Sequence, residues 1–349
     1  MSQAPIYVEE QTVRKILTWP MAIEATKQAL SAVSNSSEKN GSLPTVDQPA
    51  RSFTRTAERK GVLLSMPGYV GNYSIGNKKS DSLGCKLVTA FPKNLQLAQP
   101  LPNILANIFL MDTSTGQLKC IMEGTEITAW RTTAASLNAT KYLYYERPGF
   151  QAPEGAVLAI IGCGVEGRYH AIGMCSTFGI SEVHLWNRTK SKAESLKIEL
   201  ENLRNTFQNT NVKISIFELS ETCATTADIV VTATFADSPV LSYKSLKKNA
   251  HVNAIGAGIN HFSELDSELY LKGQLYVDTM TGAKIELKGL NAEIIGEVGE
   301  VINGFKPTPK NGITIFQSMG MACEDVLLAE AVYAALTDTE CSGLRIPKM

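Results

Sequence analysis

The sequence predicts an α/β protein built on a doubly wound parallel sheet that is inserted in a second, α+β domain. Three observations support this fold class. The apolar run 157–161 is short, is bounded by turn residues and meets a glycine cluster at once, as expected of a buried parallel strand. Strand-like and helical segments alternate from there to residue 278. Before it, strand signals follow one another to residue 123, which indicates a separate mixed or antiparallel sheet.

The first part of the chain is expected to combine this sheet with two helices. The pattern predicts a short strand at 6–9, a helix at 19–34, a polar loop at 34–41 and strands at 61–66, 85–90, 107–112 and 118–123. Turn residues at 114–116 predict that the last two strands form a hairpin. A helix with small side chains follows at 126–145, and Pro148 and Pro153 end it.

The second part is expected to hold a series of about five parallel strands with helices between them. The strand signals lie at 157–161, 182–186, 213–217, 227–232, 251–255 and 275–278, with helices at 165–178 and 190–203 and a polar surface loop at 202–211. A strand-like stretch at 314–316 and an amphipathic helix at 320–336 come last. Since that helix can return to the first domain, we expect domains at 1–130 with 320–349 and at 131–319.

Three glycines follow the first of these parallel strands in the spacing Gly-x-Gly-x-x-Gly: Gly162, Gly164 and Gly167. The first permits a tight turn, the second lets the backbone approach a pyrophosphate, and the third lets the next helix pack closely on the sheet. The amino end of that helix offers unpaired N–H groups and a positive dipole to phosphates. A chance glycine cluster would lack the strands on either side, so we expect a dinucleotide cofactor.

The end of the second parallel strand indicates which dinucleotide to expect. An acidic residue there accepts hydrogen bonds from the adenosine ribose and favours NAD. This chain has Asn187, Arg188 and Thr189 instead, with Lys190 and Lys192 behind them. A guanidinium, a hydroxyl and ammonium groups suit a phosphate on the ribose, so we expect NADP(H). The alternative is that Asn187 and Thr189 only cap the helix that begins here.

Composition limits the partners and the compartment. The 33 basic and 34 acidic residues leave a net charge of -1, which gives no general attraction to nucleic acid or membranes. The 7 cysteines form no C-x-x-C pair and the 4 histidines are not in ligand spacing, so we expect a reduced protein with no metal site. Because the sequence also shows no membrane-length apolar run and no address signal, we expect a cytoplasmic protein that acts on a small molecule.

Nine stretches spread in order over nearly the whole chain form a recognisable set. They are QPAR at 48–51, CKLVT at 85–89, MEGTEITAWRT at 122–132, 161–165, LWNRTK at 185–190, HVNAIGA at 251–257, 263–266, 297–307 and SMGMACED at 318–325. Together they resemble the ornithine cyclodeaminase/mu-crystallin family, and most closely its mu-crystallin, or ketimine reductase, branch. The resemblance implies a substrate-binding and dimerisation domain at 1–130 with 320–349, an NADP-binding domain at 131–319, and a homodimer.

The resemblance also implies that Arg51, Lys86 and Arg131 face the substrate, with Lys86 and Arg131 as catalytic residues. Two guanidiniums and an ammonium group can hold an α-carboxylate, and a bidentate arginine fixes the plane of the carbon to be reduced. A further substrate contact is implied at Glu286, whose carboxylate could pair with a protonated imine nitrogen. Each has an ordinary alternative, since Arg51 and Glu286 could be solvated charges and Lys86 a lysine on an edge strand.

For the cofactor, the family pattern implies contacts from the phosphate turn, from the loop at the ribose phosphate, from residues towards the nicotinamide, and from Arg131. The turn residues are Gly162, Cys163, Gly164, Val165 and Glu166, those at the ribose phosphate are Asn187, Arg188, Thr189 and Lys192, and those towards the nicotinamide are Thr234, Phe235, Ile255 and Ser318. Cys163 is thus expected to be a small turn residue and not a nucleophile.

Two residues depart from the cyclodeaminase pattern. Gly258 stands where the cyclodeaminases carry an aspartate that serves deamination, and Leu64 replaces a carboxylate expected in the GVxELMP segment. Losing both acids removes the obvious means of activating an amine and water, which favours net reduction or oxidation over ornithine cyclisation. His261 lies close by in a loop before a helix, where we expect a structural role.

The sequence therefore predicts an NADPH-dependent reductase of a C=N bond next to a carboxylate, in a cyclic ketimine such as piperideine-2-carboxylate or pyrroline-2-carboxylate. Three alternatives stay open. The first is an alanine-type amino acid dehydrogenase, which would run the same hydride step with ammonia as a partner. The others are an ornithine cyclodeaminase and a binding protein of the mu-crystallin type that holds NADPH and a thyroid hormone, or iodothyronine.

Overall fold

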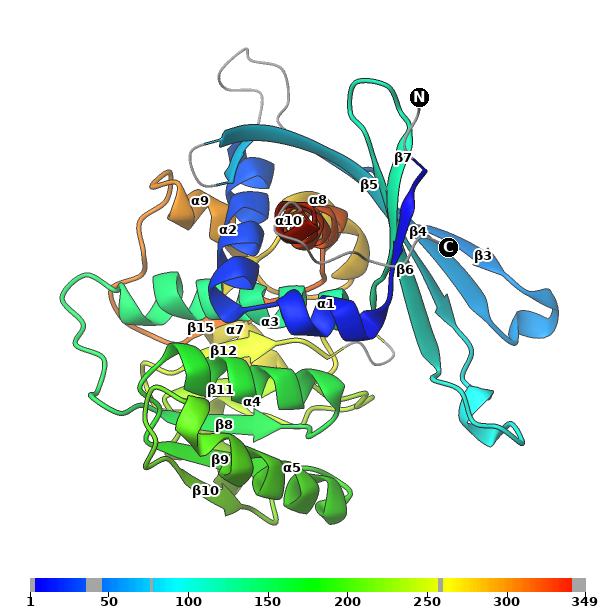
Figure 1. The fold of residues 1–349 in the computed structure, drawn as a ribbon. Helices are drawn as coiled ribbons and strands as arrows, with labels where there is room; N and C mark the ends of the chain where they lie inside the picture. Colours follow the sequence, from blue (N-terminus) through cyan, green and yellow to red (C-terminus); the bar gives the residue numbers. More distant parts are fainter. Residues whose placement is uncertain (1–3, 36–45, 76–77, 257–259, 341–349) are drawn as a thin grey trace. The chain divides into compact units, whose positions relative to one another are not determined.

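The computed structural model describes residues 4–35, 46–75, 78–256 and 260–340 (Figure 1). The chain divides into two compact units, Met1–Arg131 with Met321–Met349 and Thr132–Gly320. The expected domain boundaries lie within one residue of this division, while the roles expected for the two parts stay predictions. Most of the expected loop at 34–41 lies outside the described residues.

Over the described residues, the first unit is built on a seven-stranded sheet with the order β1-β7-β6-β5-β4-β2, in which β3 also pairs with β4. Strand β1 pairs in parallel with β7, whereas β2 to β7 pair antiparallel. Its elements are β1 (Ile6–Val8), α1 (Glu10–Ile16), α2 (Trp19–Asn35), β2 (Val46–Asp47), β3 (Ser52–Arg55), η2 (Ala57–Arg59), β4 (Val62–Ile75), β5 (Lys78–Ala90), η3 (Asn94–Gln96), β6 (Ile104–Met111), β7 (Leu118–Glu123), the start of α3 (Thr125–Thr140) and α10 (Ala322–Glu340). The hairpin predicted around residues 114–116 is confirmed, because β6 and β7 pair across that turn.

The β4–β5 hairpin is the main departure from the predicted elements of this unit. Its strands contain 14 and 13 residues, so the strands predicted at 61–66 and 85–90 are only fragments of them. Glycines in these strands interrupt the hydrophobic alternation, and they do so where α10 packs closely on the sheet. A Cβ added at Gly68 or Gly84 would lie 3.1 Å from Ala322 or Val326 of α10.

The two faces of this sheet differ in burial. A cross-strand row on the face covered by α10 is buried and consists of Val8, Met122, Ile108, Lys86 and Met66. The neighbouring row points the other way, is half-buried or exposed, and consists of Tyr7, Ile121, Phe109, Cys85 and Pro67. Side chains in antiparallel strands alternate between faces, so one face of the unit is core and the other is an apolar surface.

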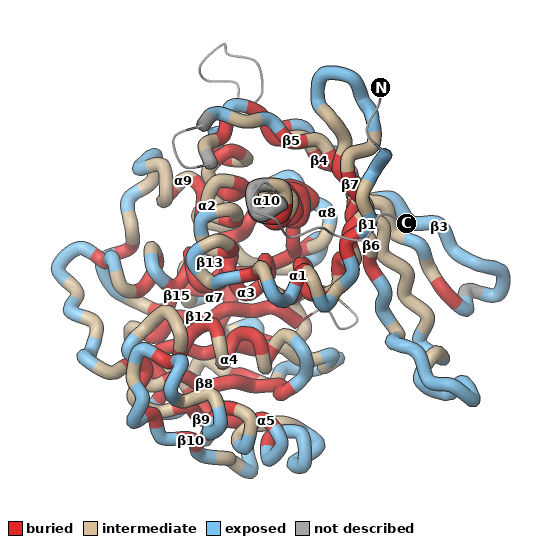
Figure 2. Tube along the Cα trace, viewed as in Figure 1, coloured by how far each residue is buried: buried red, intermediate tan, exposed pale blue. Residues whose placement is uncertain are grey.

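Helix α10 is not amphipathic, contrary to the prediction. Every residue from Ala322 to Glu330 is buried, and Figure 2 shows most of the helix as buried. The sheet lies against one side of the helix, and a cluster that includes Ala29 of α2 packs with Cys323 and Leu327. A helix that is covered on several sides needs apolar residues all round, so its sequence lacks the hydrophobic periodicity of an amphipathic helix.

The second unit is built on an eight-stranded sheet, as far as the structure describes it, with the order β10-β9-β8-β11-β12-β15-β13-β14. All its strand pairs are parallel. Its elements are η4 (Lys141–Tyr145), β8 (Val157–Ile161), α4 (Val165–Thr177), β9 (Glu182–Trp186), α5 (Lys190–Leu203), η5 (Arg204–Thr206), β10 (Lys213–Ile216), α6 (Ser220–Ala224), β11 (Ile229–Thr232), η6 (Tyr243–Ser245), β12 (His251–Ala254), α7 (Ser267–Lys272), β13 (Gln274–Val277), α8 (Met280–Glu286), β14 (Ile294–Glu297), α9 (Val298–Ile302) and β15 (Thr314–Gln317). The expected count of about five strands was wrong, because the strand-like stretch at 314–316 joins the same sheet as β15 and because β14 was not predicted.

The strand order reverses between β8 and β11, which makes this pair the switch point of the doubly wound sheet. Chain order runs outward through β9 and β10 on one side and through β11 and β12 on the other. In Figure 1, α4 and α5 lie side by side over the strands they connect. Ligands of such sheets bind at the carboxyl ends of the strands beside the switch point, so the fold directs attention to the loops after β8, β9 and β11.

Two histidines lie inside this unit as neutral hydrogen-bonding groups. His170 of α4 contacts the hydroxyl of Ser136 at 2.9 Å, and burial lowers its pKa to about 4. His251 of β12 contacts the hydroxyl of Thr314 at 2.9 Å, and burial, with the charge of Arg147, lowers its pKa to about 3. Both side chains therefore belong to the core and not to a site that titrates near neutral pH.

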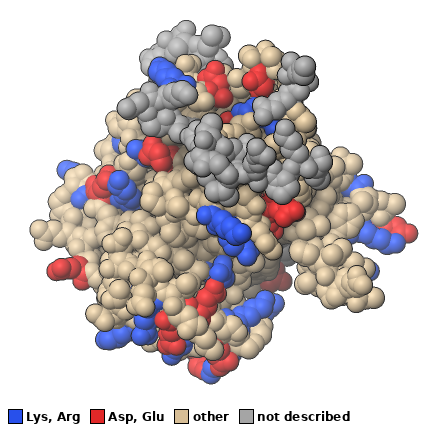
Figure 3. Space-filling view, in the orientation of Figure 1, with Lys and Arg blue, Asp and Glu red and all other residues tan. Residues whose placement is uncertain are grey.

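Charged side chains of both signs are interspersed on the face drawn in Figure 3. This distribution matches the near balance of 33 basic and 34 acidic residues. None of the helices in the described ranges is both long and apolar enough to cross a membrane. The same ranges contain no group of three potential metal-binding side chains close enough to hold an ion.

Candidate active site

The glycine turn after β8 has the geometry that a phosphate cradle requires. Gly162 has a φ of 107°, and a Cβ there would lie 2.5 Å from the carbonyl oxygen of Ala233. A Cβ at Gly167 would collide with the carbonyl of Gly162, so this glycine lets α4 pack against the turn. Gly164, in contrast, has nothing within 4 Å of an added Cβ and precedes the first residue of α4. The turn therefore presents an open backbone and a helix amino end, which suits a diphosphate.

Hydrogen bonds of Cys163 and Asn187 stabilise this turn. The backbone N–H of Cys163 donates to Oδ1 of Asn187 at 2.9 Å, and Nδ2 of Asn187 donates to the carbonyl of Thr189 at 2.9 Å. Burial raises the pKa of the Cys163 thiol to about 12, so it stays protonated near neutral pH. The side chain of Asn187 thus joins the turn after β8 to the loop after β9.

The loop after β9 carries exposed cations and a hydroxyl. Arg188, Thr189 and Lys192 are exposed, and within the described ranges Arg188 and Lys192 form no ion pair. Lys190 differs, because its Nζ lies 2.6 Å from Oε1 of Glu218. The loop therefore offers one guanidinium and one ammonium group that are not neutralised by a carboxylate in this part of the structure.

The carboxyl ends of β11 and β12 are held together by Glu264, which the sequence reasoning missed. Oε1 of Glu264 accepts hydrogen bonds from the backbone N–H and the hydroxyl of Thr234, both at 2.6 Å. Oε2 accepts from the hydroxyl of Thr232 at 2.7 Å and from the backbone N–H of Gly256 at 2.8 Å. Burial raises the pKa of Glu264, while these donors oppose the shift. The hydroxyl of Thr234 thus donates its hydrogen bond to Glu264 and helps to hold the ends of these two strands together.

Three other predicted cofactor residues lie at the same edge of the sheet. Phe235 follows Thr234 and is 82% exposed, whereas Ile255 after β12 and Ser318 after β15 are buried. Asp278, at the end of β13, holds the turn beyond Ser318, because its Oδ2 accepts from the backbone N–H groups of Met319 and Gly320 at 2.8 and 2.7 Å. The structure thus brings these residues to one edge of the sheet, where Phe235 offers an exposed aromatic face.

The predicted substrate cations of the first unit meet at two acidic residues that the sequence reasoning missed. Nζ of Lys86, in β5, lies 2.7 Å from Oδ2 of Asp325, and Nε of Arg131, in α3, lies 3.1 Å from Oδ1 of the same carboxylate. Nη1 of Arg131 lies 3.2 Å from Oε2 of Glu324. All four side chains are buried. Two cations and two anions therefore form a charge-balanced cluster, which we call the Asp325 cluster.

Glu324 and Asp325 occupy the first turn of α10, where the helix dipole favours negative charge. The start of this helix is also held by Gln48, whose Oε1 accepts from the backbone N–H of Cys323 at 3.3 Å. Gln48 belongs to the same QPAR segment as the half-buried Arg51. The segment that carries Arg51 is thus fixed beside the acidic residues that hold Lys86.

The pKa of the Lys86 ammonium group is strongly shifted. Burial above all, together with the charges of Arg131 and Arg51 and against the opposing effect of Asp325, lowers this pKa to about 8. Nζ of Lys86 also lies 3.5 Å from the hydroxyl oxygen of Thr128. An amine with this pKa can give up and take back a proton near neutral pH, which an ordinary surface lysine does not do.

Glu286, the last residue of α8, belongs to the second unit and pairs with a histidine. Its Oε2 lies 2.6 Å from Nε2 of His261, and the two side chains are 17% and 20% exposed. The alternative that Glu286 is only a solvated helix charge is therefore wrong, while its expected contact with a substrate stays a prediction. The departure at Gly258 lies outside the described residues, and Leu64 is a half-buried residue of β4.

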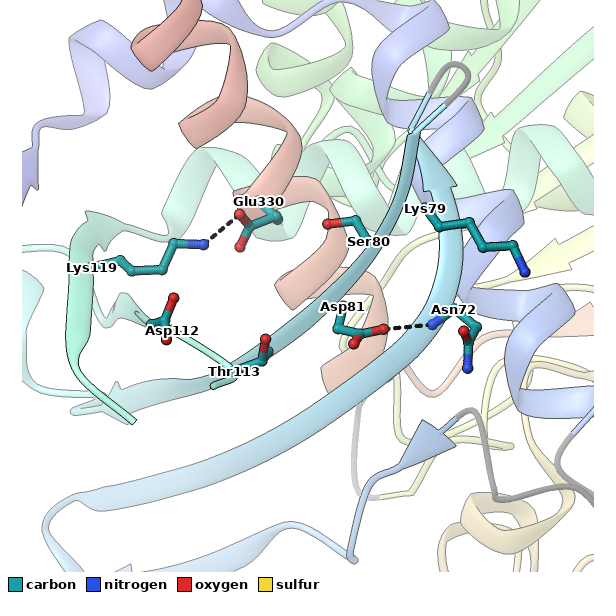
Figure 4. Close-up of a pocket in the computed structure, with 8 residues that line it drawn as sticks. All are labelled: Asn72, Lys79, Ser80, Asp81, Asp112, Thr113, Lys119 and Glu330. Carbon is teal, nitrogen blue, oxygen red and sulfur yellow. Dashed lines mark hydrogen bonds and ion pairs between the residues drawn. The ribbon is translucent and has the colours of Figure 1, made fainter. Parts of the chain in front are cut away.

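A separate polar pocket with a volume of about 380 Å³ opens at the far ends of the hairpins of the first unit (Figure 4). Lys119 and Glu330 line it and are joined by an ion pair of 2.6 Å, and Asp81 accepts from the backbone N–H of Asn72 at 2.7 Å. None of the predicted site residues lines this pocket. Because its buried carboxylate is already neutralised by Lys119, we assign the pocket no part in the candidate active site.

The fold and these two sites define an α/β protein in which the second unit has a Rossmann-type sheet with a glycine phosphate turn and the first unit buries a cluster of acidic and basic side chains. The chain belongs to the ornithine cyclodeaminase/mu-crystallin family, whose model matches residues 10–340. The resemblance seen in the sequence and the expected fold class are thereby confirmed.

Three relatives illustrate the likeness. The chain is 33% identical over 337 residues to the ketimine reductase mu-crystallin of Macropus fuliginosus, covering 95% of this chain and 98% of that protein. The solved structure of Thermococcus litoralis Δ1-pyrroline-2-carboxylate reductase, in complex with NADH and L-proline, is 28% identical, has a TM-score of 0.80, and covers 96% of this chain and 98% of its own. An archaeal alanine dehydrogenase dimer with bound NAD is 25% identical, with a TM-score of 0.80 and 99% of each chain covered.

Proposed function

We propose that this protein is an oxidoreductase that reduces the C=N bond of cyclic ketimines to cyclic amino acids with NADPH. Piperideine-2-carboxylate and pyrroline-2-carboxylate represent the substrate class. The observation that carries the proposal is the Asp325 cluster, in which a buried lysine with a pKa of about 8 lies beside a buried arginine. The 33% identity to a ketimine reductase over 95% of the chain supports the same conclusion.

The cluster explains how an imino acid would be held. Lys86 and Arg131 pair with Asp325 and Glu324, and the guanidinium of Arg51 lies close enough for its charge to act on Lys86. The substrate carboxylate binds to Arg51 and takes further hydrogen bonds from Lys86 and Arg131. Fixing the plane of the substrate in this way orients the carbon to be reduced, and positioning of that kind can supply roughly 7 to 11 kcal/mol of a barrier.

An imine accepts hydride well only when its nitrogen is protonated. Lys86, or a water that it holds, is the proposed proton donor, because an ammonium group with a pKa of about 8 is a usable acid near neutral pH. The carboxylate of Glu286 is proposed to stabilise the positive charge of the protonated imine. Bound NADPH would supply the hydride.

The loops of the second unit fit an NADP cofactor. The open backbone at Gly164 suits the diphosphate, and the exposed Arg188, Thr189 and Lys192 suit a phosphate on the ribose. The solved relatives described above carry NADH or NAD. We propose NADP(H) for this chain because no acidic residue follows β9 in the stretch 187–190, which instead carries a guanidinium and an ammonium group.

The test is a cofactor-oxidation assay followed by absorbance at the reduced nicotinamide band. Purified protein is mixed with NADPH or NADH and with either cyclic imino acid, and we expect turnover with an imino acid and a preference for NADPH. Arg51→Gln should raise KM for the imino acid while leaving the dissociation constant for NADPH unchanged. Wild-type protein that binds NADPH and oxidises none of it with either imino acid would refute the proposal.

A second candidate function is an alanine-type amino acid dehydrogenase, which the likeness to the archaeal alanine dehydrogenase favours. Supplying pyruvate with ammonia in place of a preformed cyclic imine separates the two reactions in the same assay. Ornithine cyclodeaminase activity is less well supported, since Leu64 supplies no carboxylate. A mu-crystallin-type role in binding an iodothyronine would appear as competition between that ligand and the imino acid.

We further propose a cytoplasmic homodimer. The outward row of the first sheet, from Tyr7 to Pro67, is apolar and only half-buried, and two chains could cover this face for each other. A dimer is also named for the archaeal relative. Ile121→Arg should shift the mass measured by light scattering from two chains to one, and a wild-type monomer would contradict this assembly.

A further inference from the structure

A single carboxylate holds the two loops that leave β11 and β12. Glu264 is 1% exposed, and each of its oxygens accepts one backbone N–H. Oε1 accepts from Thr234 at 2.6 Å, and Oε2 accepts from Gly256 at 2.8 Å. Because these two amides follow different strands, the carboxylate fixes the starts of the two loops relative to each other. A buried carboxylate with four donors around it is also costly to move, since each donor would lose its partner.

The backbone at Gly256 leaves room for this carboxylate. A Cβ added there would collide with the carboxyl group of Glu264, which supplies its three nearest atoms. The φ of Gly256 lies outside the left-handed region, so the backbone conformation does not itself require a glycine. The close approach of Glu264 is therefore the reason for a glycine at this position.

The segment that carries Glu264 is itself attached to the loop after β11. The backbone carbonyl of Glu264 accepts from the N–H groups of Val240 and Leu241 at 2.7 and 3.1 Å. The hydroxyl of Ser263 donates to the carbonyl of Ala236 at 2.8 Å. The carboxylate thus has a fixed base on one loop and reaches from there to the first residues after β12.

The two loops lie where the second half of a dinucleotide is expected. The glycine turn follows β8 and Arg188 follows β9, both on one side of the switch point between β8 and β11. A dinucleotide lies across such a switch point, so the half that is not at β9 belongs over the ends of β11 and β12. The loop after β11 also packs on the phosphate turn, since a Cβ at Gly162 would lie 2.5 Å from the carbonyl oxygen of Ala233.

We propose that Glu264 is a positioning residue for the nicotinamide half of the cofactor, because it holds the loops after β11 and β12 in the arrangement that this half binds. This inference rests on the cofactor of the proposed function and deepens it. Glu264 is buried and acts only through the loops that it joins. Loops that are already ordered cost the cofactor less binding free energy, and this is the advantage that the carboxylate supplies.

The experiment compares two ligands in Glu264→Gln and wild type. The amide keeps the size of the carboxylate but replaces one acceptor by an NH2 group, so the N–H of Thr234 or of Gly256 must face a donor. We expect the dissociation constant for NADPH, measured by calorimetry, to rise about tenfold. The constant for 2′,5′-ADP, which lacks the nicotinamide half, should change less than twofold. Ala233 stays in place in this variant, because its N–H donates to the carbonyl of Ile161 at 2.8 Å.

Gly256→Ala tests the same contact from the other side. Its methyl group should displace the carboxylate and weaken NADPH binding about as much as Glu264→Gln does, again without affecting 2′,5′-ADP. In a Glu264→Ala background, adding Gly256→Ala should change the NADPH constant less than twofold, because the atoms that the methyl group would meet are gone. Circular dichroism melts identify a variant that fails to fold, and Gly256→Ala decides if Glu264→Gln does so.

Two matched variants separate positioning from general stability. Asp266→Ala removes a carboxylate that accepts the N–H of Leu269 at 2.7 Å and caps α7, two residues beyond Glu264. It should lower the melting temperature and change neither dissociation constant. Arg188→Ala, in the loop after β9, should weaken NADPH and 2′,5′-ADP together, because both ligands carry the adenosine phosphate.

The outcomes separate this role from the proposed function. If Glu264→Gln weakens 2′,5′-ADP as much as NADPH, or weakens neither, the positioning role is overturned. If wild-type protein binds NADPH but reduces neither imino acid, the proposed reaction fails, and the two dissociation constants still decide the role of Glu264. If wild-type protein binds no NADPH, both proposals fail.

Discussion

Asp325→Asn is the most informative single substitution, because one carboxylate holds two buried cations. Lys86 lies 2.7 Å from one oxygen and Arg131 lies 3.1 Å from the other. The Coulomb attraction of unit charges at 2.7 Å is about 6 kcal/mol with an effective dielectric constant of about 20. Burying a neutral asparagine amide costs less desolvation free energy than burying a carboxylate, and this difference offsets part of the lost attraction. We therefore expect a net loss of about 3 to 5 kcal/mol in the free energy of unfolding, as for other broken buried pairs.

The measurement can be confined to the unit that contains the cluster. Trp19 and Trp130 stack in that unit with ring centroids 4.1 Å apart, and the third tryptophan, Trp186, lies in the other unit. Denaturant unfolding is therefore followed by tryptophan fluorescence in a Trp186→Phe background. Glu24→Gln is the control, since its exposed pair with Lys27 at 3.7 Å should contribute less than about 0.5 kcal/mol.

The double variant Asp325→Asn/Lys86→Met tests the cause of the loss. Removing one buried charge leaves the other without its partner, whereas removing both relieves that penalty. The double variant should therefore be more stable than the sum of the two single losses predicts. A loss below about 1 kcal/mol for Asp325→Asn, or strict additivity, would refute the account of the Asp325 cluster.

Three further predictions concern the rate, the cofactor and acid stability. The value of kcat/KM for imine reduction should fall above about pH 8, because Lys86 is protonated below its pKa of about 8 and loses the proton above it. Turnover should also be faster at mildly acidic pH. A rate that stays flat from pH 5 to 8 would contradict a protonated substrate. Arg188→Ala should raise KM for NADPH about tenfold or more and change KM for NADH less than twofold. Lys190→Ala is the control, because the ammonium group of Lys190 is already paired with Glu218 at 2.6 Å, and it should leave KM for both cofactors nearly unchanged. Equal KM values in Arg188→Ala and wild type would refute the NADP assignment. The pKa values of His170 and His251 lie below the ordinary value of 6.5, so the unfolded chain binds protons at a higher pH than the folded protein does. The free energy of unfolding should therefore fall as the pH drops from about 6 to 4, by about 1.4 kcal/mol per pH unit for each histidine. His170→Gln should remove the contribution of His170 to this slope, and an unchanged slope would count against the burial argument.

The sequence could locate the elements whose signals are local. The strands at 157–161 and 182–186 agree with β8 and β9, and the helix predicted at 165–178 ends one residue from α4. Short apolar runs bounded by glycine and turn residues determine these elements, so neighbours in the sequence are sufficient evidence. The family motifs likewise led to Lys86 and Arg131, which the structure places on one carboxylate.

The elements and residues that were missed depend on distant partners. Gly68 and Gly84 interrupt the pattern of the long hairpin because α10 needs the space, and α10 comes more than 230 residues later. Asp325 shows the same limit, because it lies 194 residues from Arg131 in sequence. Acidic residues in a first helical turn are common in proteins generally, so only the pairing in three dimensions reveals that Asp325 neutralises two cations.

The pairing of His261 with Glu286 was missed for a related reason. A single histidine in a polar loop carries no periodic or spacing signal, and its partner Glu286 follows 25 residues later in another connection. The strand order brings the two loops together, since β15 enters the sheet between β12 and β13. That order could not be derived from a pattern that predicted about five strands.

The placement of Asp325 near the end of the chain has a consequence for biosynthesis. Lys86 and Arg131 leave the ribosome long before the helix that neutralises them, so the first unit cannot complete its interior until translation has passed residue 325. Thr132–Gly320 is continuous in sequence and can fold in the meantime. A nascent chain stalled before α10 would expose the sheet face that this helix covers, and chaperones would be expected to bind that intermediate.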